Sequence, residues 1–299
     1  MQTEAGFQLH AVDLMYQRVP GSIGSWIVKG PAGWVVIESG PASTWAALEQ
    51  GLRALGVLPG EVSAVLLTHI HLDHAGGAWK FAEAGVPIHL HHVGSPHLID
   101  PSRLERSARR VYGDRYDALW GPMHPCDPDL VHAIGDGDVV EAAGLRFEAI
   151  ESLGHANHHH AWHVLGSKDL FTGDAVGMRV PGTDWITVPM PPPEFDPAVW
   201  STTLDRIAAG PWDRFHLTHG GTVTDTHAHI AQLRSSMATQ MQWLERSRGM
   251  EGRWAAYAEV LRESAAPYNV PDQLFQAHAS PGRLDMNLSG VDRWIANRQ

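Results

Sequence analysis

Three histidines and one aspartate lie within six positions of the chain, between residues 69 and 74. They follow a run of branched apolar residues, 62–67, that is typical of a buried strand. Imidazole and carboxylate are ligands for zinc, iron and manganese. In an extended or tightly turning segment, His69 and His71 can point the same way and share one ion. Asp73 and His74 lie where the chain must turn toward a helix, so they can face a second position beside the first.

The alternative is that these are surface histidines at the end of a strand. A lone histidine would favour that interpretation, but four ligand-type residues in the pattern His-x-His-x-Asp-His favour a metal site. Gly76 and Gly77 permit the close backbone approach that the turn requires. The segment resembles the hallmark motif of the metallo-β-lactamase superfamily, which also follows a buried strand.

Three positions downstream resemble the remaining ligands of that superfamily, in the same order. A strand over 145–152 runs into Gly-His at His155, a second strand ends in Thr-Gly-Asp at Asp174, and a third ends in Thr-His at His219. The resemblance implies that Asp174 bridges two metals, and that His159 lies usually outside their direct ligands. It assigns His69, His71 and His155 to the first metal, and Asp73, His74 and His219 to the second.

The resemblance also implies a mechanism and a metal. Two divalent cations would ionise a bridging water to hydroxide near neutral pH, and Asp73 would orient that water and carry a proton to the leaving group. Since no thiolate enters the set, the ligands do not force zinc; zinc is the expected metal, with iron and manganese as alternatives.

This sequence differs from the motifs of several branches of the superfamily, and these differences reduce the number of reactions that it is expected to catalyse. True β-lactamases of the superfamily have cysteine or serine where this chain has Asp174, and acyl-homoserine lactonases use a tyrosine that is missing between Asp174 and His219. Glyoxalase II binds its thiol through basic residues of a helical C-terminal domain, whereas this chain has no lysine after Lys168. We expect a dinuclear hydrolase of a small ester, lactone or thioester. The alternatives are an iron-dependent persulfide dioxygenase, a phosphodiesterase, or a binding protein without turnover.

The family resemblance, over about residues 10–225, implies an α+β, four-layer αββα sandwich with the metals at one sheet edge. Strands are predicted at 8–19, 25–29 and 33–38, and the resemblance places a catalytic domain at 1–225. Beyond it, helical spacing predicts a C-terminal extension at 226–299 that packs on the sandwich or on another subunit of a homodimer, or that covers the active site.

Two further segments are candidates for substrate contact. A proline-rich stretch, 180–197, contains Trp185 and Met190 and is expected to form one wall of the pocket. His159 is a further candidate contact. An arginine-rich segment, 95–117, reads as a solvated surface helix or as a positive rim that draws an anionic substrate toward the metals.

Composition sets the remaining expectations. The chain has 299 residues, of which 43% are hydrophobic, enough for a large core. Its net charge of -11 argues against nucleic acid as a partner and favours a small-molecule substrate. The first residues carry no basic segment followed by an apolar stretch, and no apolar run approaches a membrane span, so a cytoplasmic location without a membrane partner is expected.

Overall fold

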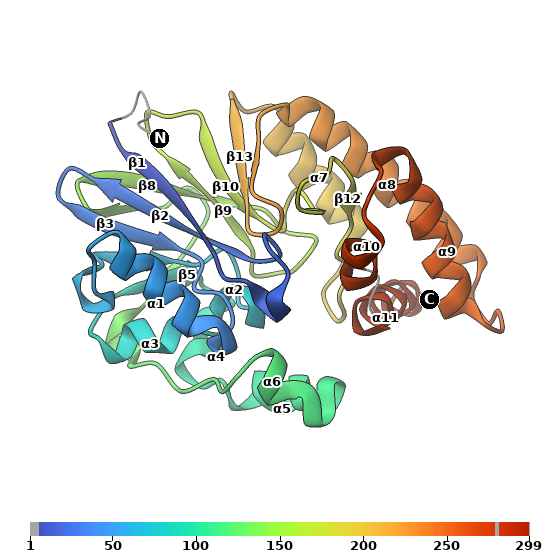
Figure 1. Ribbon diagram of the computed structural model, residues 1–299, viewed down its shortest axis with the longest axis horizontal. Coiled ribbons are helices and arrows are strands. Elements are labelled where there is room, and N and C mark those ends of the chain that lie inside the picture. Colours follow the sequence, from blue (N-terminus) through green and yellow to red (C-terminus); the bar gives the residue numbers. More distant parts are fainter. Residues whose placement is uncertain (1–5, 279–280, 299) are drawn as a thin grey trace.

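The computed structural model describes residues 6–278 and 281–298, and two six-stranded sheets form the centre of that part (Figure 1). In the first sheet β1 to β3 form an antiparallel meander, and β3 to β6 run parallel. Its strands, in spatial order, are β1 (Gln8–Asp13), β2 (Gly24–Gly30), β3 (Gly33–Ile37), β4 (Ala64–Leu66), β5 (Ile88–His91) and β6 (Val131–Ile134). The second sheet has the spatial order β14 (Thr222–Val223), β13 (Arg214–Leu217), β10 (Asp169–Gly173), β9 (His160–Val164), β8 (Leu145–Glu151) and β7 (Val139–Ala142). A small ribbon pairs β11 (Met178–Arg179) with β12 (Ile186–Thr187).

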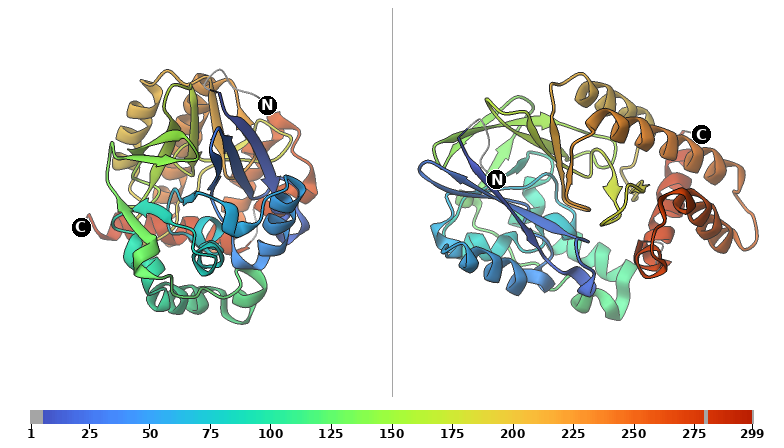
Figure 2. Two further views of the ribbon diagram at one scale, coloured as in Figure 1. Left: turned by 90° about the vertical axis from the view of Figure 1, so that its left-hand side faces the viewer. Right: turned by 45° about the horizontal axis from the view of Figure 1, so that its top comes forward.

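Helices cover the outer face of each sheet (Figure 2). The first sheet packs against α1 (Trp45–Ala54), α3 (Ala78–Glu83), α4 (Ser95–Ile99), α5 (Ser102–Tyr112) and α6 (Tyr116–Leu119). The second packs in one core with α7 (Pro197–Ala208), α8 (Thr226–Arg246), α9 (Arg253–Ala265), α10 (Asp272–His278) and α11 (Pro281–Ala296). The short α2 (Leu72–Ala75) follows β4. None of the helices in the described ranges has the length and apolar character needed to cross a bilayer.

A separate apolar core lies between the sheets and contains Trp26, Phe147 and Trp162. Both tryptophans also reach strand ends that precede predicted ligands. Trp162 Nε1 donates a hydrogen bond to the carbonyl oxygen of Leu67, and Trp26 Nε1 donates to that of Leu217, each at 3.0 Å. The layers therefore follow the order αββα, which confirms the predicted fold class.

Some predicted boundaries were wrong. The first strand ends at Asp13 rather than continuing to residue 19, because the Asp13 carboxylate accepts hydrogen bonds from the backbone of Met15 and Gly21 and closes a loop there. Strand β6 and the β11–β12 ribbon were not predicted. The proposed limit at residue 225 coincides with Asp225, whose side chain caps α8, while the division into two domains stays a prediction because the C-terminal helices share one core with the second sheet.

A buried ion pair fixes two neighbouring parallel strands of the second sheet. Asp169 of β10 lies 2.5 Å from Arg214 Nε and 2.8 Å from His216 Nε2, both on β13. Burial alone would raise the pKa of Asp169, but hydrogen bonds from His216 and Arg214 lower it to about 2. These strands lead into Asp174 and His219, so the pair holds the register from which two predicted ligands project.

Replacing Asp169 with Asn should lower the free energy of unfolding by about 3 kcal/mol at pH 7, because Arg214 and His216 lose their buried partner. Since the folded-state pKa is depressed, this stabilisation is present above the unfolded-state pKa near 4 and is lost as pH falls toward 2. Urea denaturation of both proteins between pH 7 and 3 measures the effect. Asp213→Asn, at an exposed surface pair with Lys168, is the control and should cost less than about 1 kcal/mol.

Candidate metal centre

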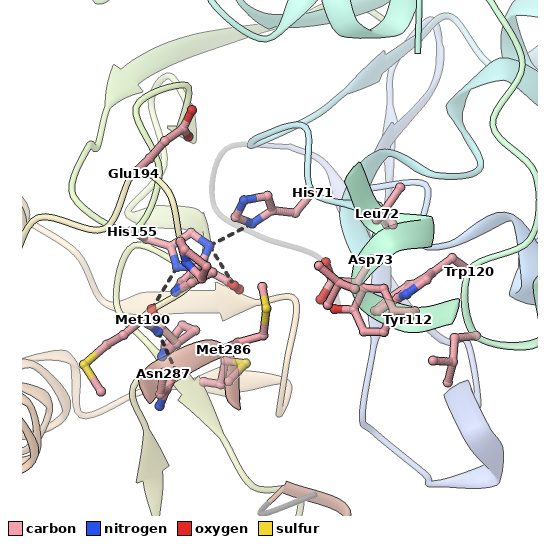
Figure 3. Close-up of a pocket in the computed structure, with 18 of the residues that line it drawn as sticks. His71, Leu72, Asp73, Tyr112, Trp120, His155, Met190, Glu194, Met286 and Asn287 are labelled. Carbon is pink, nitrogen blue, oxygen red and sulfur yellow. Dashed lines mark hydrogen bonds and ion pairs between the residues drawn. The ribbon is translucent and has the colours of Figure 1, made fainter. Parts of the chain in front are cut away.

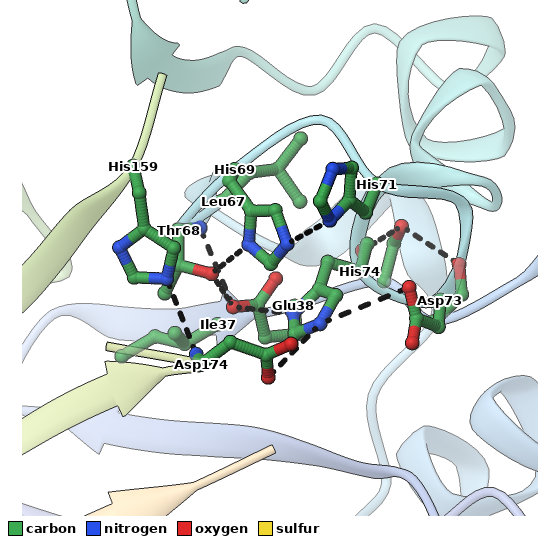
Figure 4. Close-up of polar contacts among 12 residues, drawn as sticks. Ile37, Glu38, Leu67, Thr68, His69, His71, Asp73, His74, His159 and Asp174 are labelled. Carbon is green, nitrogen blue, oxygen red and sulfur yellow. Dashed lines mark hydrogen bonds and ion pairs between the residues drawn. The ribbon is translucent and has the colours of Figure 1, made fainter. Parts of the chain in front are cut away.

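All seven predicted ligand residues lie together at one edge of the sandwich, just beyond the ends of four strands. Figure 4 shows the segment from His69 to His74 facing Asp174. The end of β4 leads into the first group, and β8, β10 and β13 each lead into one more residue. In chain order the residues are His69 and His71 after β4, Asp73 and His74 within α2, His155 after β8, Asp174 after β10, and His219 after β13.

Three imidazoles face one another on one side of this cluster. His71 Nδ1 lies 2.9 Å from His69 Nε2 and 3.0 Å from His155 Nε2. An ion about 2.0–2.1 Å from each nitrogen would place neighbouring ligand atoms roughly 3 Å apart. The spacing of the three nitrogens therefore suits a single metal ion.

A second group forms on the other side. Asp73 Oδ2 lies 3.4 Å from His219 Nε2, and Asp73 Oδ1 lies 3.9 Å from His74 Nε2. Asp174 stands between the groups: its Oδ2 is 3.4 Å from His155 Nε2, and its Oδ1 is 3.5 Å from Nε2 of both His74 and His219. Asp174 can thus contribute one oxygen to each of two positions, as the resemblance implies.

The outward nitrogens of these rings are oriented by acceptors elsewhere in the chain. His155 Nδ1 donates to the carbonyl oxygen of Pro189 at 3.0 Å, and His219 Nδ1 donates to that of Ser22 at 2.6 Å. A carbonyl can only accept, so the proton lies on Nδ1 and the lone pair of Nε2 faces the cluster. Such partners are typical of metal-binding histidines.

The cluster contains buried polar atoms without protein partners. Among the described residues, His74 Nε2, Asp174 Oδ1 and His219 Nε2 are buried and form no hydrogen bond. Leaving such atoms unsatisfied is costly, and a divalent cation among them would satisfy all three. The donor set, imidazole nitrogen and carboxylate oxygen without sulfur, fits zinc, iron or manganese.

Burial and charge set the protonation of these groups in opposite directions. Burial, reinforced by His155, lowers the pKa of His71 to about 3, and burial together with His74 lowers that of His69 well below its usual value. Burial would also lower the pKa of His74, but Glu38 and Asp174 raise it well above the ordinary value. The lowered pKa values of His69 and His71 favour the neutral imidazoles that metal binding requires, whereas at His74 a cation would compete with a proton.

Glu38 is a buried part of this centre that sequence reasoning missed. Its Oε1 lies 3.3 Å from His74 Nδ1, and it accepts hydrogen bonds from the backbone N–H and the hydroxyl of Thr68. Its φ of +70° lies in the left-handed region, which is uncommon for a residue other than glycine and marks functional positions. In the sequence, Glu38 could have been noticed only as a single carboxylate directly after the apolar strand 33–37.

A second missed pair consists of His158 and Glu194. His158 Nε2 lies 3.1 Å from a Glu194 carboxylate oxygen, and both side chains line the cavity beside His71. Burial alone would raise the pKa of Glu194, but the hydrogen bond with His158 lowers it to about 2. The run of three histidines at 158–160 concealed this pair, because it did not show which ring would face the cavity.

A cavity of about 720 Å³ opens over the cluster (Figure 3). Tyr112 and Trp120 lie on one side of it, and Met190 and Met286 on the other. His71, Asp73 and His155 of the cluster also line it. Its side chains are mainly apolar and come from α5, α6, the loop after β12, and the C-terminal helices.

The three expected substrate-contact residues have different positions. Met190 lines the cavity, so its role stays a prediction. Trp185 does not: it is 2% exposed in the core, stacks on Phe275, and donates a hydrogen bond to Ser264. His159 is also fully buried behind the cluster, where its Nε2 accepts a hydrogen bond from the backbone N–H of Asp174. The C-terminal helices cover Trp185, which sequence alone did not show.

Comparison with known proteins identifies the family. The profile of the metallo-beta-lactamase superfamily matches residues 18–219, and the chain belongs to this superfamily. It is 28% identical over 183 residues to the metallo-beta-lactamase fold-containing protein ST1585 of Sulfurisphaera tokodaii, a match covering 59% of this chain and 68% of that protein. The crystal structure of ST1585 superposes with a TM-score of 0.68 at 19% identity, covering 95% of this chain and 98% of the other.

Two relatives are named as hydrolases. The chain is 30% identical over 190 residues to a hydroxyacylglutathione hydrolase of Aeromonas hydrophila, covering 63% of this chain and 57% of that enzyme. It is 27% identical over 175 residues to an acyl-coenzyme A thioesterase of Gallus gallus, covering 50% of this chain and 56% of that enzyme. The chain thus spans little more than half the length of these two relatives. Family membership and the histidine and aspartate clusters together support a metallohydrolase.

Replacing Asp174 with Ala should remove at least one of two bound ions and lower kcat at least about 100-fold, because both groups lose a shared ligand. Metal content after gel filtration and the thermal midpoint by circular dichroism check this. Asp213→Ala, at an exposed site, should retain wild-type metal content. Two tightly bound ions and full turnover in Asp174→Ala would contradict the assignment.

Proposed function

We propose that this chain is a dinuclear metal-dependent hydrolase, with zinc as the expected metal, that cleaves an acyl ester, lactone or thioester bond. The observation that carries the proposal is the convergence of seven ligand-type side chains beneath an apolar cavity of about 720 Å³. The names of the two hydrolase relatives, a hydroxyacylglutathione hydrolase and an acyl-coenzyme A thioesterase, support acyl substrates.

The residues divide the chemical task. Bound to this cluster, two divalent cations would lower the pKa of a water molecule and polarise the scissile carbonyl. Asp73, about a quarter exposed at the cavity floor, is placed to orient an attacking water and to carry a proton to the leaving group. The apolar part of the walls lowers the local dielectric and so strengthens charge interactions beside the metal cluster.

Arginines at the cavity favour a thioester of an anionic carrier within this class. Arg103 and Arg115 line it from one wall, and Arg293 of α11 lines it from the other. None of these three forms an ion pair with another residue in the described part of the chain. By contrast Arg109, on the same helix as Arg103, pairs with Glu105 and Asp117. In a chain of net charge -11, unpaired cations at a cavity suit a phosphate- or carboxylate-bearing substrate.

A panel of acyl-coenzyme A thioesters, neutral esters, lactones and a phosphodiester should show metal-dependent cleavage of the thioesters and esters. Metal content measured on the same preparation should give about two ions per chain. Hydrolysis of the phosphodiester alone would favour the phosphodiesterase alternative. One iron per chain with oxygen uptake on a persulfide would favour the dioxygenase.

Replacing Arg103 and Arg115 together with Gln should raise KM for an acyl-coenzyme A about threefold to tenfold, because exposed charge pairs contribute on the order of 1 kcal/mol. Kinetics on a neutral ester should stay close to wild type. Arg109→Gln is the matched control, since its partners lie on the protein surface away from the cavity. Equal losses on neutral and anionic substrates would show that these arginines do not recognise charge.

A further inference from the structure

The side chain of Asn287, on α11, uses its full amide for hydrogen bonds to residues beside the metal centre (Figure 3). Its Oδ1 accepts from the backbone N–H of Met190 at 2.9 Å, and its Nδ2 donates to the carbonyl oxygen of Val188 at 2.9 Å. Nδ2 also donates to the Tyr257 hydroxyl at 3.1 Å. Asn287 therefore holds the backbone on both sides of Pro189.

Pro189 is the residue whose carbonyl oxygen orients a predicted ligand. It accepts from His155 Nδ1 at 3.0 Å, which directs His155 Nε2 toward His71 and Asp174. A shift of this carbonyl would rotate the His155 imidazole, or would allow its proton to move from Nδ1 to Nε2. The hydrogen bonds of Asn287 thus reach His155 through a single backbone group.

The sequence around Pro189 leaves few other ways to fix it. Residues 189 and 191–193 are prolines and have no backbone N–H, so Met190 carries the one donor in the run 189–193. Strand β12 has already ended at Thr187, and no sheet pairing continues into this run. The single available donor is the one that Asn287 binds.

Two more observations show that this contact is built tightly. A Cβ atom on Gly290, one turn after Asn287, would lie 1.9 Å from the Met190 carbonyl oxygen, so α11 approaches the loop at a distance that only glycine allows. The Tyr257 hydroxyl that receives the Asn287 amide itself donates to Gln240 Oε1 at 2.6 Å. Both Tyr257 and Gln240 are buried, so α8, α9 and α11 support one polar network in an apolar core.

We propose that the C-terminal extension positions a metal ligand, with Asn287 holding residues 188–190 so that the Pro189 carbonyl fixes His155. Asn287 is a positioning residue, because it acts through the backbone and the His155 ring. The inference rests on the metal centre of the proposed function, and it gives the extension a role in metal binding in addition to walling the cavity.

Asn287→Ala tests the role through metal affinity, by competition with a chromogenic chelator. Loss of an outer partner of a metal-binding histidine typically weakens binding 10- to 100-fold, so we expect about that loss for one of the two ions, with the ion at Asp73, His74 and His219 retained. In the metal-free protein, nitrogen-edited NMR should show the His155 ring losing its single Nδ1–H tautomer. A variant with wild-type affinity for both ions and an unchanged tautomer would overturn the proposal.

Ser264→Ala is the matched control, because Ser264 of α9 joins the extension to the other end of β12, by accepting from Trp185 Nε1 at 3.1 Å, but does not reach Pro189. It should keep both affinities; equal metal loss in both variants would reduce the role of Asn287 to general stability. If Asn287→Ala does not fold, Tyr257→Phe removes only the outer support, and we expect a smaller loss for the same ion. No such loss in a folded Tyr257→Phe would then overturn the proposal. A wild-type protein that binds two ions but cleaves no acyl substrate would contradict the proposed function and leave this test intact.

Discussion

The constraint on which the structure depends is the burial of mutually facing donor atoms at the seam between two sheets. His74, Asp174 and His219 present buried polar atoms to one another at the base of the cavity, and these atoms form no hydrogen bond with any residue that the structure describes. An arrangement of this kind is unfavourable for the bare chain and is sustained by rigid surroundings. The strands that end at the site are short, buried and joined by side chains such as Trp26 and Trp162, which tie the two sheets together at their ligand-bearing ends.

The rings of the centre are held from distant parts of the chain. Ser22, before β2, orients His219, while Pro189, after β12, orients His155. Glu38, at the end of β3, neighbours His74 and also binds Thr68. His74, His155 and His219 therefore each contact a residue from another part of the chain on the side away from the cluster. Metal binding at these histidines would be coupled to the folding of those segments.

The sequence predicts those parts of the site whose residues are close together in the chain, and it does not predict those that only the fold brings together. The segment from His69 to His74 could be interpreted from spacing alone, since its ligands are neighbours in the chain. His155, Asp174 and His219 required a family resemblance, because one histidine or aspartate after a strand is not distinctive. The carbonyl groups of Ser22 and Pro189 could not be found at all, since every residue has a carbonyl and only the fold selects these two. The burial of Trp185 could not be predicted for a related reason: a loop position suggests exposure, but helices more than 70 residues later in the chain cover this side chain.

Much of the cavity wall comes from segments of the chain that contain none of the predicted metal ligands. Residues from α5, η4 (Gly113–Arg115) and α11 line the walls, yet none of the seven predicted ligands lies in them. Substitutions in α5 and η4 therefore change the cavity wall without replacing a predicted ligand, whereas α11 also contacts the backbone beside Pro189 through Asn287. For enzyme engineering, this marks solvent-facing positions such as Val111, 58% exposed at the cavity, as places to randomise without disturbing the centre below.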